Sequence, residues 1–198
     1  RPFLVVAPTS VVPNWGSEAA RFTPGLKVVT IGDTTAKSKV PLAEVVAGAD
    51  VVITSYAVFR LDFASYRKLD WDGLILDEAQ FVKNRVTRVH QCARDLPAPF
   101  KLAITGTPME NNLMELWGLF AIVAPGLFPS ARKFADEYQR PIERGDSPDL
   151  LARLRRRIRP LLMRRTKEAV AKDLPEKQEQ VLDCLLYTSP SPRDKRQS

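Results

Sequence analysis

The sequence has little cysteine, little histidine and no long apolar run. Its 198 residues include two cysteines, Cys92 and Cys184, and one histidine. Two cysteines so far apart exclude a disulfide framework and a cysteine-rich zinc site, and they suit a reducing compartment. No apolar run approaches the roughly 18 residues that a membrane-spanning helix needs. No charged-then-apolar leader opens the chain. We therefore expect a cytoplasmic protein with no membrane partner.

The overall composition is that of a globular protein with a basic surface. Hydrophobic residues make up 44% of the chain and charged residues 27%, which is typical of a folded domain. The formal net charge is +7, and a basic balance favours a polyanionic partner such as nucleic acid. Many basic proteins bind no nucleic acid, so the prediction of a nucleic-acid partner depends on the motifs.

Both ends of the chain predict a fragment of a longer protein. Arg1 opens the chain without an initiator methionine, and the last fifteen residues, 184–198, are rich in Ser, Pro and Arg. One interpretation of this segment is a disordered tail. We prefer another, because 184–194 is also one reading frame of a transposon adapter used in sequencing libraries. The segment is therefore predicted to be disordered adapter read-through, with Cys184 at an uncertain junction.

Strand-like and helix-like segments alternate along the first two thirds of the chain. Nearly continuous apolar segments predict strands buried on both faces: Phe3–Ala7, Leu26–Ile31, Asp50–Ser55, Gly73–Asp77 and Lys101–Thr105. Helical patterns cover Val12–Phe22, Ala36–Ala47, Thr87–Asp95, Met114–Val123, Ser130–Arg140 and Asp149–Arg157. This alternation predicts an α/β fold with a parallel sheet and helices on both faces. We expect residues 1–128 to form this lobe and residues 129–183 a helical extension.

Polar and small residues follow four of the predicted strands. Parallel sheets bind ligands at the carboxyl ends of their strands, so these residues predict one functional edge. They are Pro8-Thr9-Ser10, Thr54-Ser55-Tyr56, Asp77-Glu78-Ala79-Gln80 and Thr105-Gly106-Thr107-Pro108.

The segment GLILDEAQ, residues 73–80, carries the strongest chemical signal. An apolar strand ends in two adjacent carboxylates, Asp77 and Glu78. Phosphoryl transfer from a nucleotide needs a magnesium ion near the phosphates and a group that orients the attacking water. We assign the Mg²⁺ to Asp77, through water, and the attacking water to Glu78. A bare acidic pair after a strand is usually only a turn, but this strand context favours a nucleotide hydrolase.

A second signal is the Thr-Gly-Thr-Pro sequence that ends the last predicted strand. Gly106 permits a tight turn and Pro108 stops the strand. We expect the hydroxyls of Thr105 and Thr107 to bond to the carboxylates on the neighbouring strand end. That contact would let the nucleic-acid side sense the state of the nucleotide. The predicted catalytic set is Asp77, Glu78, Gln80, Thr105, Gly106 and Thr107.

Taken together, the motifs resemble those of the Swi/Snf-type ATPases of helicase superfamily 2. DEAQFVKN (77–84) resembles motif II of that family, and LAITGTPMENNLMELW (102–117) resembles its motif III with an extension. LVVAPTSVVPNW (4–15) and VVITSYAVF (51–59) resemble motifs Ia and Ib, and LLMRRTKEAVAKDLPEK (161–177) resembles the segment that leaves the first lobe. The matches cover nearly all of the chain before the predicted tail, in the family's order.

The resemblance implies the first of two RecA-like lobes, ATP and Mg²⁺ as cofactors, and movement along double-stranded DNA. It also implies a second RecA-like lobe of the same protein as a partner, in the bacterial cytoplasm or nucleoid. Small hydroxyls and N–H groups at strand ends suit DNA phosphates, and they also cap helices. The DNA-binding candidates are Thr9, Ser10, Thr54, Ser55, Lys83 and Asn84. The candidates for coupling the lobes are Arg164, Arg165 and Lys167.

Several features limit this hypothesis or stand outside it. The phosphate-loop pattern G-x-x-x-x-G-K-[ST] does not occur in the chain, so the chain supplies only part of an ATP site. A DEAD-box RNA helicase lobe and a non-catalytic nucleic-acid-binding module remain as alternatives, and the Thr-Gly-Thr-Pro sequence argues against the first. We interpret Trp15 and Trp117 as core residues rather than base-stacking platforms.

Overall fold

The computed structural model describes residues 1–106, 112–145 and 148–165. Two predicted site residues, Thr107 and Lys167, and the predicted tail lie outside the described residues. The chain divides into two compact units, Arg1–Arg156 and Arg157–Ser198. The predicted functional edge belongs to the first unit. Among the described residues, no helix has the length and apolar character needed to cross a bilayer.

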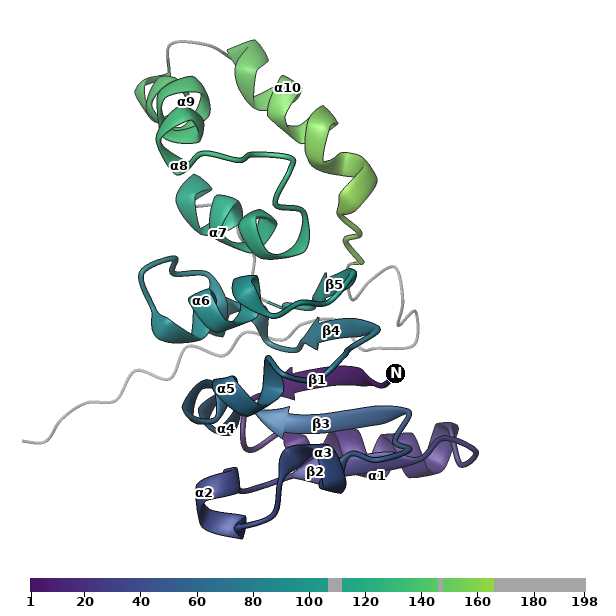
Figure 1. The fold of residues 1–198 in the computed structure, drawn as a ribbon. Helices are drawn as coiled ribbons and strands as arrows, with labels where there is room; N and C mark the ends of the chain where they lie inside the picture. The colour runs from purple at the N-terminus through teal and green to yellow at the C-terminus, as the bar shows by residue number, and fades with distance from the viewer. Residues whose placement is uncertain (107–111, 146–147, 166–198) are drawn as a thin grey trace, which may run out of the picture. The chain divides into compact units, whose positions relative to one another are not determined.

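A five-stranded parallel sheet forms the centre of the first unit, which confirms the predicted fold class (Figure 1). Its order is β2-β3-β1-β4-β5, so the first strand lies in the middle. The register places Leu4 beside Val52 of one neighbour and beside Leu74 of the other. The strands are β1 (Phe3–Ala7), β2 (Val28–Ile31), β3 (Val51–Ser55), β4 (Gly73–Leu76) and β5 (Phe100–Ala103).

The helices agree with the prediction in part. The helix predicted over Ala36–Ala47 is two short helices, because Pro41 interrupts it. The helices are α1 (Val12–Phe22), α2 (Thr35–Ser38), α3 (Leu42–Val45), α4 (Tyr56–Leu61), α5 (Phe63–Tyr66), α6 (Arg88–Asp95), α7 (Leu113–Val123), α8 (Ala131–Phe134), α9 (Arg140–Arg144) and α10 (Pro148–Ile158). A 3₁₀ turn covers Ala79–Val82, a π-helical turn Ala135–Gln139 and a second 3₁₀ turn Arg159–Leu161.

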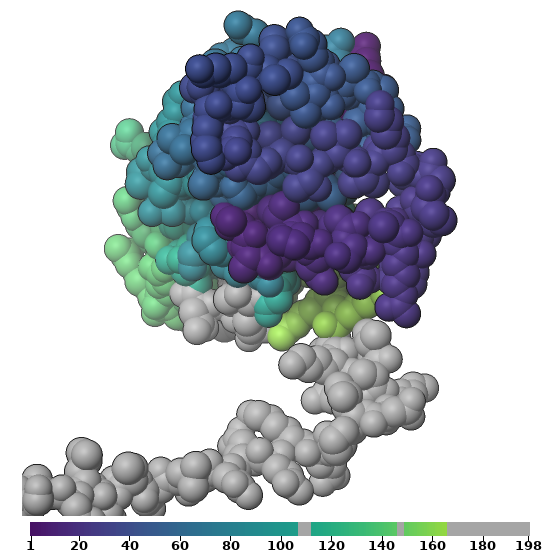
Figure 2. Space-filling view, turned by 90° about the horizontal axis from the view of Figure 1, so that it is seen from below, coloured from purple at the N-terminus to yellow at the C-terminus, as the bar shows by residue number. Residues whose placement is uncertain are grey.

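The two faces of the sheet are covered differently. Side chains alternate between the faces with a period of two. On one face, Leu4, Leu74 and Leu76 pack with residues of α4 to α7 in the main core. On the other face, Val5 and Ile53 pack under α1 in a smaller cluster. Seen from below in Figure 2, the purple and blue amino-terminal part of the chain makes up most of the visible surface.

Strand β5 departs from the prediction that every strand is buried on both faces. Within the described residues it pairs only with β4. The side chains of Phe100, Leu102 and Ile104 are 49%, 40% and 41% exposed. Helix α1 packs on β2 and β3, which lie toward the other edge of the sheet from β5. The prediction was wrong here because an apolar strand pattern does not say whether a helix covers each face.

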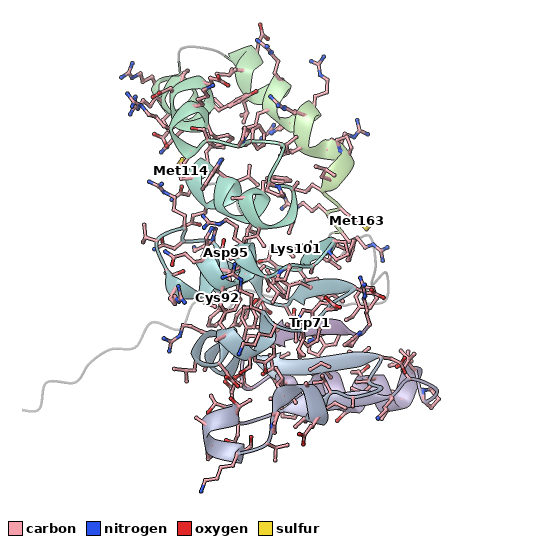
Figure 3. All side chains as sticks on the ribbon, viewed as in Figure 1. Trp71, Cys92, Asp95, Lys101, Met114 and Met163 are labelled. Atoms are coloured by element: carbon pink, nitrogen blue, oxygen red, sulfur yellow. The ribbon has the colours of Figure 1, made fainter. Side chains whose placement is uncertain are left out.

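The opposite face of β5 is tied to the end of α6. The Lys101 ammonium donates to the main-chain oxygens of Ala93 and Arg94, at 2.9 and 2.7 Å. Figure 3 shows Lys101 beside Asp95, the last residue of that helix. Burial lowers the pKa of Lys101 to about 8. A cation at the carboxyl end of a helix satisfies carbonyls that lack partners within the helix.

The helices after β5 have an aromatic core of their own. Phe128 contacts Phe134 and Tyr138 edge to face. The indole N–H of Trp117 in α7 donates to the Phe128 main-chain oxygen at 2.9 Å. Trp117 is buried, which confirms its interpretation as a core residue. This packing fixes α7 beside the loop that carries the acidic pair.

Helix α7 packs tightly against that loop at Gly118. A Cβ atom at Gly118 would lie 2.2 Å from the main-chain oxygen of Lys83. We expect Gly118→Ala to lower the free energy of unfolding by about 1–3 kcal/mol, as overpacking does, despite alanine's helix preference of roughly 1 kcal/mol. Urea denaturation measures the change. Gly126→Ala is the control, because a Cβ there meets nothing within 4 Å; equal effects of the two would contradict the close-packing argument.

Candidate functional site at the carboxyl edge of the sheet

The acidic pair lies where the sequence predicts it, directly after the carboxyl end of β4. The Asp77 main-chain N–H donates to the Val6 oxygen of β1 at 2.9 Å, which extends the pairing of the two strands. The Ala79 N–H donates to the Ile104 oxygen at 2.8 Å. Neighbours on both sides therefore hold the backbone of the pair, and both carboxylates are half-buried.

Three hydrogen bonds fix Asp77. The indole N–H of Trp15 donates to Oδ2 at 2.7 Å, and the Glu78 main-chain N–H donates to Oδ1 at 2.9 Å. The Tyr56 hydroxyl donates to the main-chain oxygen of Asp77 at 2.7 Å. The sequence predicts Tyr56 at the functional edge but assigns it no role, and it predicts Trp15 as a core residue rather than a partner of Asp77. A signal was present, because each residue is a hydrogen-bond donor that follows a strand of the sheet. Trp15 lies in the helix after β1, and Tyr56 directly follows β3.

Tyr56 is held in place as a donor. Its ring stacks on Phe81, with centroids 5.4 Å apart and planes 11° apart. Its pKa is raised, first by burial and then by the charges of Asp77 and Glu78. The hydroxyl therefore stays protonated at neutral pH and keeps its bond to the main chain of Asp77.

Glu78 has a left-handed backbone conformation, with φ of 48° and ψ of 54°. Such a conformation costs a non-glycine residue on the order of 1–3 kcal/mol and persists where the surroundings impose it. The flanking bonds of Asp77 and Ala79 to β1 and to Ile104 supply that constraint. The turn sends the Glu78 side chain in a different direction from that of Asp77, as their distinct hydrogen-bond partners show.

A chain of side-chain hydrogen bonds links Glu78 to the end of β5. The Gln80 amide donates to Glu78 Oε2 at 2.7 Å, and the Thr105 hydroxyl donates to Gln80 Oε1 at 2.9 Å. The sequence predicts a direct bond from the threonines to the carboxylates. The structure inserts Gln80 into this link, which gives the predicted catalytic residue Gln80 a defined place. Gly106 follows as an exposed residue.

The four hydroxyl residues predicted to contact DNA divide into two kinds. Thr9 and Ser10 are exposed in the turn after β1. Thr54 is fully buried, and its hydroxyl donates to the Ile31 oxygen at 3.1 Å. Ser55 is buried and its Oγ accepts from the Val58 N–H as the cap of α4. The predicted DNA contact is therefore corrected for the side chains of Thr54 and Ser55, because both serve the fold.

The other predicted contact residues have partners of their own or are exposed. The Lys83 ammonium forms an ion pair with Glu115 at 2.9 Å, with both side chains about one third exposed. Asn84 is exposed, and its side-chain oxygen accepts from the Val86 N–H. Arg164 and Arg165 are exposed residues of the second unit.

The two carboxylates fit a magnesium ion whose remaining oxygen ligands come from water and from a bound phosphate group. Among the described residues, no group of three or more His, Cys, Asp or Glu side chains could hold a metal. Asp77 and Glu78 offer hard oxygen ligands, and Mg²⁺ is usually held by one or two carboxylates, waters and substrate phosphates. The fold is a RecA-like α/β lobe, and we call the strand end that carries Asp77 and Glu78 its acidic edge.

Comparison with known proteins places the chain in a family. The SNF2-related domain matches residues 1–190, a range that reaches into the predicted tail. The chain therefore belongs to the SNF2-related domain family, which confirms the resemblance seen in its motifs.

The relatives include much larger proteins. The putative ATP-dependent helicase/translocase YwqA of Bacillus subtilis is 39% identical over 181 residues, covering 90% of this chain and 20% of that protein. Helicase ssl-1 of Caenorhabditis elegans is 38% identical over 197 residues, covering 93% of this chain and 8% of that protein. The Sulfolobus solfataricus SWI2/SNF2 ATPase core in complex with dsDNA has a TM-score of 0.76 at 34% identity, covering 88% of this chain and 36% of that one. The chain thus spans between about a twelfth and about a third of these proteins.

Proposed function

We propose that the complete protein hydrolyses ATP to move along duplex DNA, and that this chain is part of its first motor lobe. The observation that carries the proposal is the acidic pair with its link from Glu78 through Gln80 to Thr105. That link joins the end of β4 to the end of β5. Family membership and the likeness to a SWI2/SNF2 core in complex with dsDNA support it.

The acidic edge would hold the phosphates and magnesium of ATP. Asp77 is the residue for the metal, through water, since its carboxylate is fixed by donors on both oxygens. Glu78 is the residue that orients the attacking water. When bound, Mg²⁺ supplies charge that stabilises the phosphates during transfer. Gln80 and Thr105 hold the Glu78 carboxylate in place. A shift of β5, or of the turn after β5, would therefore reorient the Glu78 carboxylate.

The DNA contacts would lie on the same edge. Thr9 and Ser10 offer exposed hydroxyls after β1, and Asn84 and Lys83 follow the acidic loop. The main-chain N–H groups near Thr54 remain candidates, although the side chain does not. We further propose that Arg164, Arg165 and Lys167 couple this lobe to a second RecA-like lobe of the same protein.

The DNA assignment predicts a salt-sensitive stimulation of hydrolysis. In the complete protein, duplex DNA should stimulate ATP hydrolysis more strongly than duplex RNA does. The DNA affinity should fall about tenfold or more between about 50 and about 200 mM salt, because phosphate contacts release counterions. Thr9→Glu should weaken the stimulation by placing a negative charge against the DNA backbone. ATP hydrolysis measured against DNA concentration gives both quantities.

The matched control is Thr23→Glu. Thr23 is also exposed, but it caps the carboxyl end of α1, whereas Thr9 lies in the turn after β1. The control makes the same charge change and should leave DNA stimulation near the wild-type value. Equal stimulation in Thr9→Glu and wild type would place the DNA path elsewhere, and stronger stimulation by RNA would favour an RNA helicase.

A further inference from the structure

The indole of Trp15 is joined to the acidic edge by an unusual choice of partner. The chain has three tryptophans. The indoles of Trp71 and Trp117 are buried and donate to main-chain oxygens, those of Tyr66 and Phe128. Trp15 instead donates to a carboxylate, Oδ2 of Asp77, at 2.7 Å across 62 residues of sequence.

The need to satisfy a buried donor does not account for this bond. Trp15 is only half-buried, so water could serve its N–H. A bond from N–H to an ionised carboxylate is shorter and about twice as strong as a neutral one. The ring itself packs against the cluster that contains Val5, Ala7 and Ile53. The indole is thus held by the core while its N–H reaches the edge.

The effect of the bond is to set the plane of the Asp77 carboxylate. Oδ2 accepts from Trp15 and Oδ1 accepts from the Glu78 main-chain N–H. A carboxylate has about four lone-pair directions, so each oxygen keeps capacity for one more partner. Tyr56 holds the main-chain oxygen of the same residue. Donors that follow β1 and β3 therefore fix both the side chain and the backbone of Asp77.

Trp15 also belongs to the helix that follows an exposed turn. The turn after β1 carries Thr9 and Ser10, and the N–H groups of Val11 and Val12 donate to the Pro8 oxygen at its start. The main-chain N–H of Trp15 then donates to the main-chain oxygen of Val11 at 3.2 Å. A displacement of this turn would move the indole and with it the Asp77 carboxylate.

We propose that Trp15 is a positioning residue. Its indole N–H orients the Asp77 carboxylate toward magnesium and couples that orientation to the position of the turn after β1. The proposal rests on the proposed function of Asp77. When a residue that hydrogen-bonds to a metal-ligating side chain is removed, metal affinity or activity typically falls by roughly 10–100-fold. The loss of the indole N–H should therefore appear as a weaker response to magnesium.

The test compares Trp15→Phe with Trp117→Phe in the complete protein. Trp117→Phe also removes one indole hydrogen bond, but from the core between α7 and Phe128. Two quantities are measured: the Mg²⁺ concentration for half-maximal DNA-stimulated ATP hydrolysis, and the affinity for ADP with and without Mg²⁺. Trp15→Phe should raise the first roughly tenfold or more and reduce the gain in ADP affinity that Mg²⁺ provides. Its metal-free ADP affinity should stay at the wild-type value.

Trp117→Phe should lower the melting temperature without changing either magnesium response. If Trp15→Phe does not fold, 3-benzothienylalanine at position 15 replaces the N–H by sulfur and keeps the ring shape. A wild-type magnesium response in a folded variant without the N–H would overturn the proposal, as would an equal change in Trp117→Phe. Wild-type protein that shows no magnesium-dependent hydrolysis would instead defeat the proposed function itself.

Discussion

Glu78→Gln in the complete protein should reduce ATP hydrolysis by a factor of about 10² to 10⁴, the range typical of a positioned acid or base, and leave ATP binding intact. Glutamine has the shape of glutamate but cannot take a proton from the attacking water. Its side-chain oxygen can still accept from the Gln80 amide, which now donates to Glu78 at 2.7 Å. The left-handed backbone at this position costs both residues alike, so the fold should survive.

Hydrolysis rates and nucleotide affinity should be measured on the same preparations. Glu44→Gln serves as the control, because Glu44 is exposed in α3 and its loss changes the net charge equally. The control should keep the wild-type rate and affinity. Near-normal turnover by Glu78→Gln would remove Glu78 from the mechanism, and lost ATP binding would show that its role is in the binding site.

The 198-residue chain alone should hydrolyse ATP at least about 10³-fold more slowly than the complete protein. Catalysis of phosphoryl transfer is mostly positioning and electrostatic stabilisation, and loss of one arginine that reaches the phosphates costs about 10³ to 10⁵ in rate. The chain contains no phosphate-loop pattern. Asp77 and Glu78 would then act on a nucleotide that is not firmly held.

The same chain should also be poorly soluble. Strand β5 has one paired edge in the described structure, and Phe100, Leu102 and Ile104 expose apolar surface beside it. Unpaired edges and apolar patches of this kind promote association. Light scattering and ATPase assays on the purified chain check both expectations. DNA-stimulated hydrolysis by the isolated chain at the rate of the complete protein would contradict the hypothesis that this chain supplies only part of an ATP site.

The sheet could be predicted from sequence because its strands are short, apolar and separated by turn residues. Strand β1 and helix α1 have the predicted bounds, Phe3–Ala7 and Val12–Phe22. Helices α4 and α5 were missed, since Tyr56–Tyr66 follows its strand without a break and carries no long helical period. Strand order was not predicted, and it depends on packing between segments distant in sequence.

The candidate site shows the same division. The acidic pair follows from adjacent residues on one strand end, so sequence places it correctly. The bond from Trp15 to Asp77 depends on where α1 lies on the sheet, which local pattern does not determine. Thr54 was predicted to contact DNA because it lies at a strand end. It shares the face of Val52, however, and the period of two in a strand turns it into the core.

The most direct test of the central claim is ATP-driven displacement of a third strand from a DNA triplex by the complete protein. Movement along the duplex would strip the third strand at a rate that follows ATP hydrolysis, and it needs no separation of the duplex strands. We predict displacement by the wild type in the presence of ATP and Mg²⁺, and none by Glu78→Gln. DNA-stimulated hydrolysis without displacement, or displacement by Glu78→Gln, would contradict a motor that this acidic edge drives.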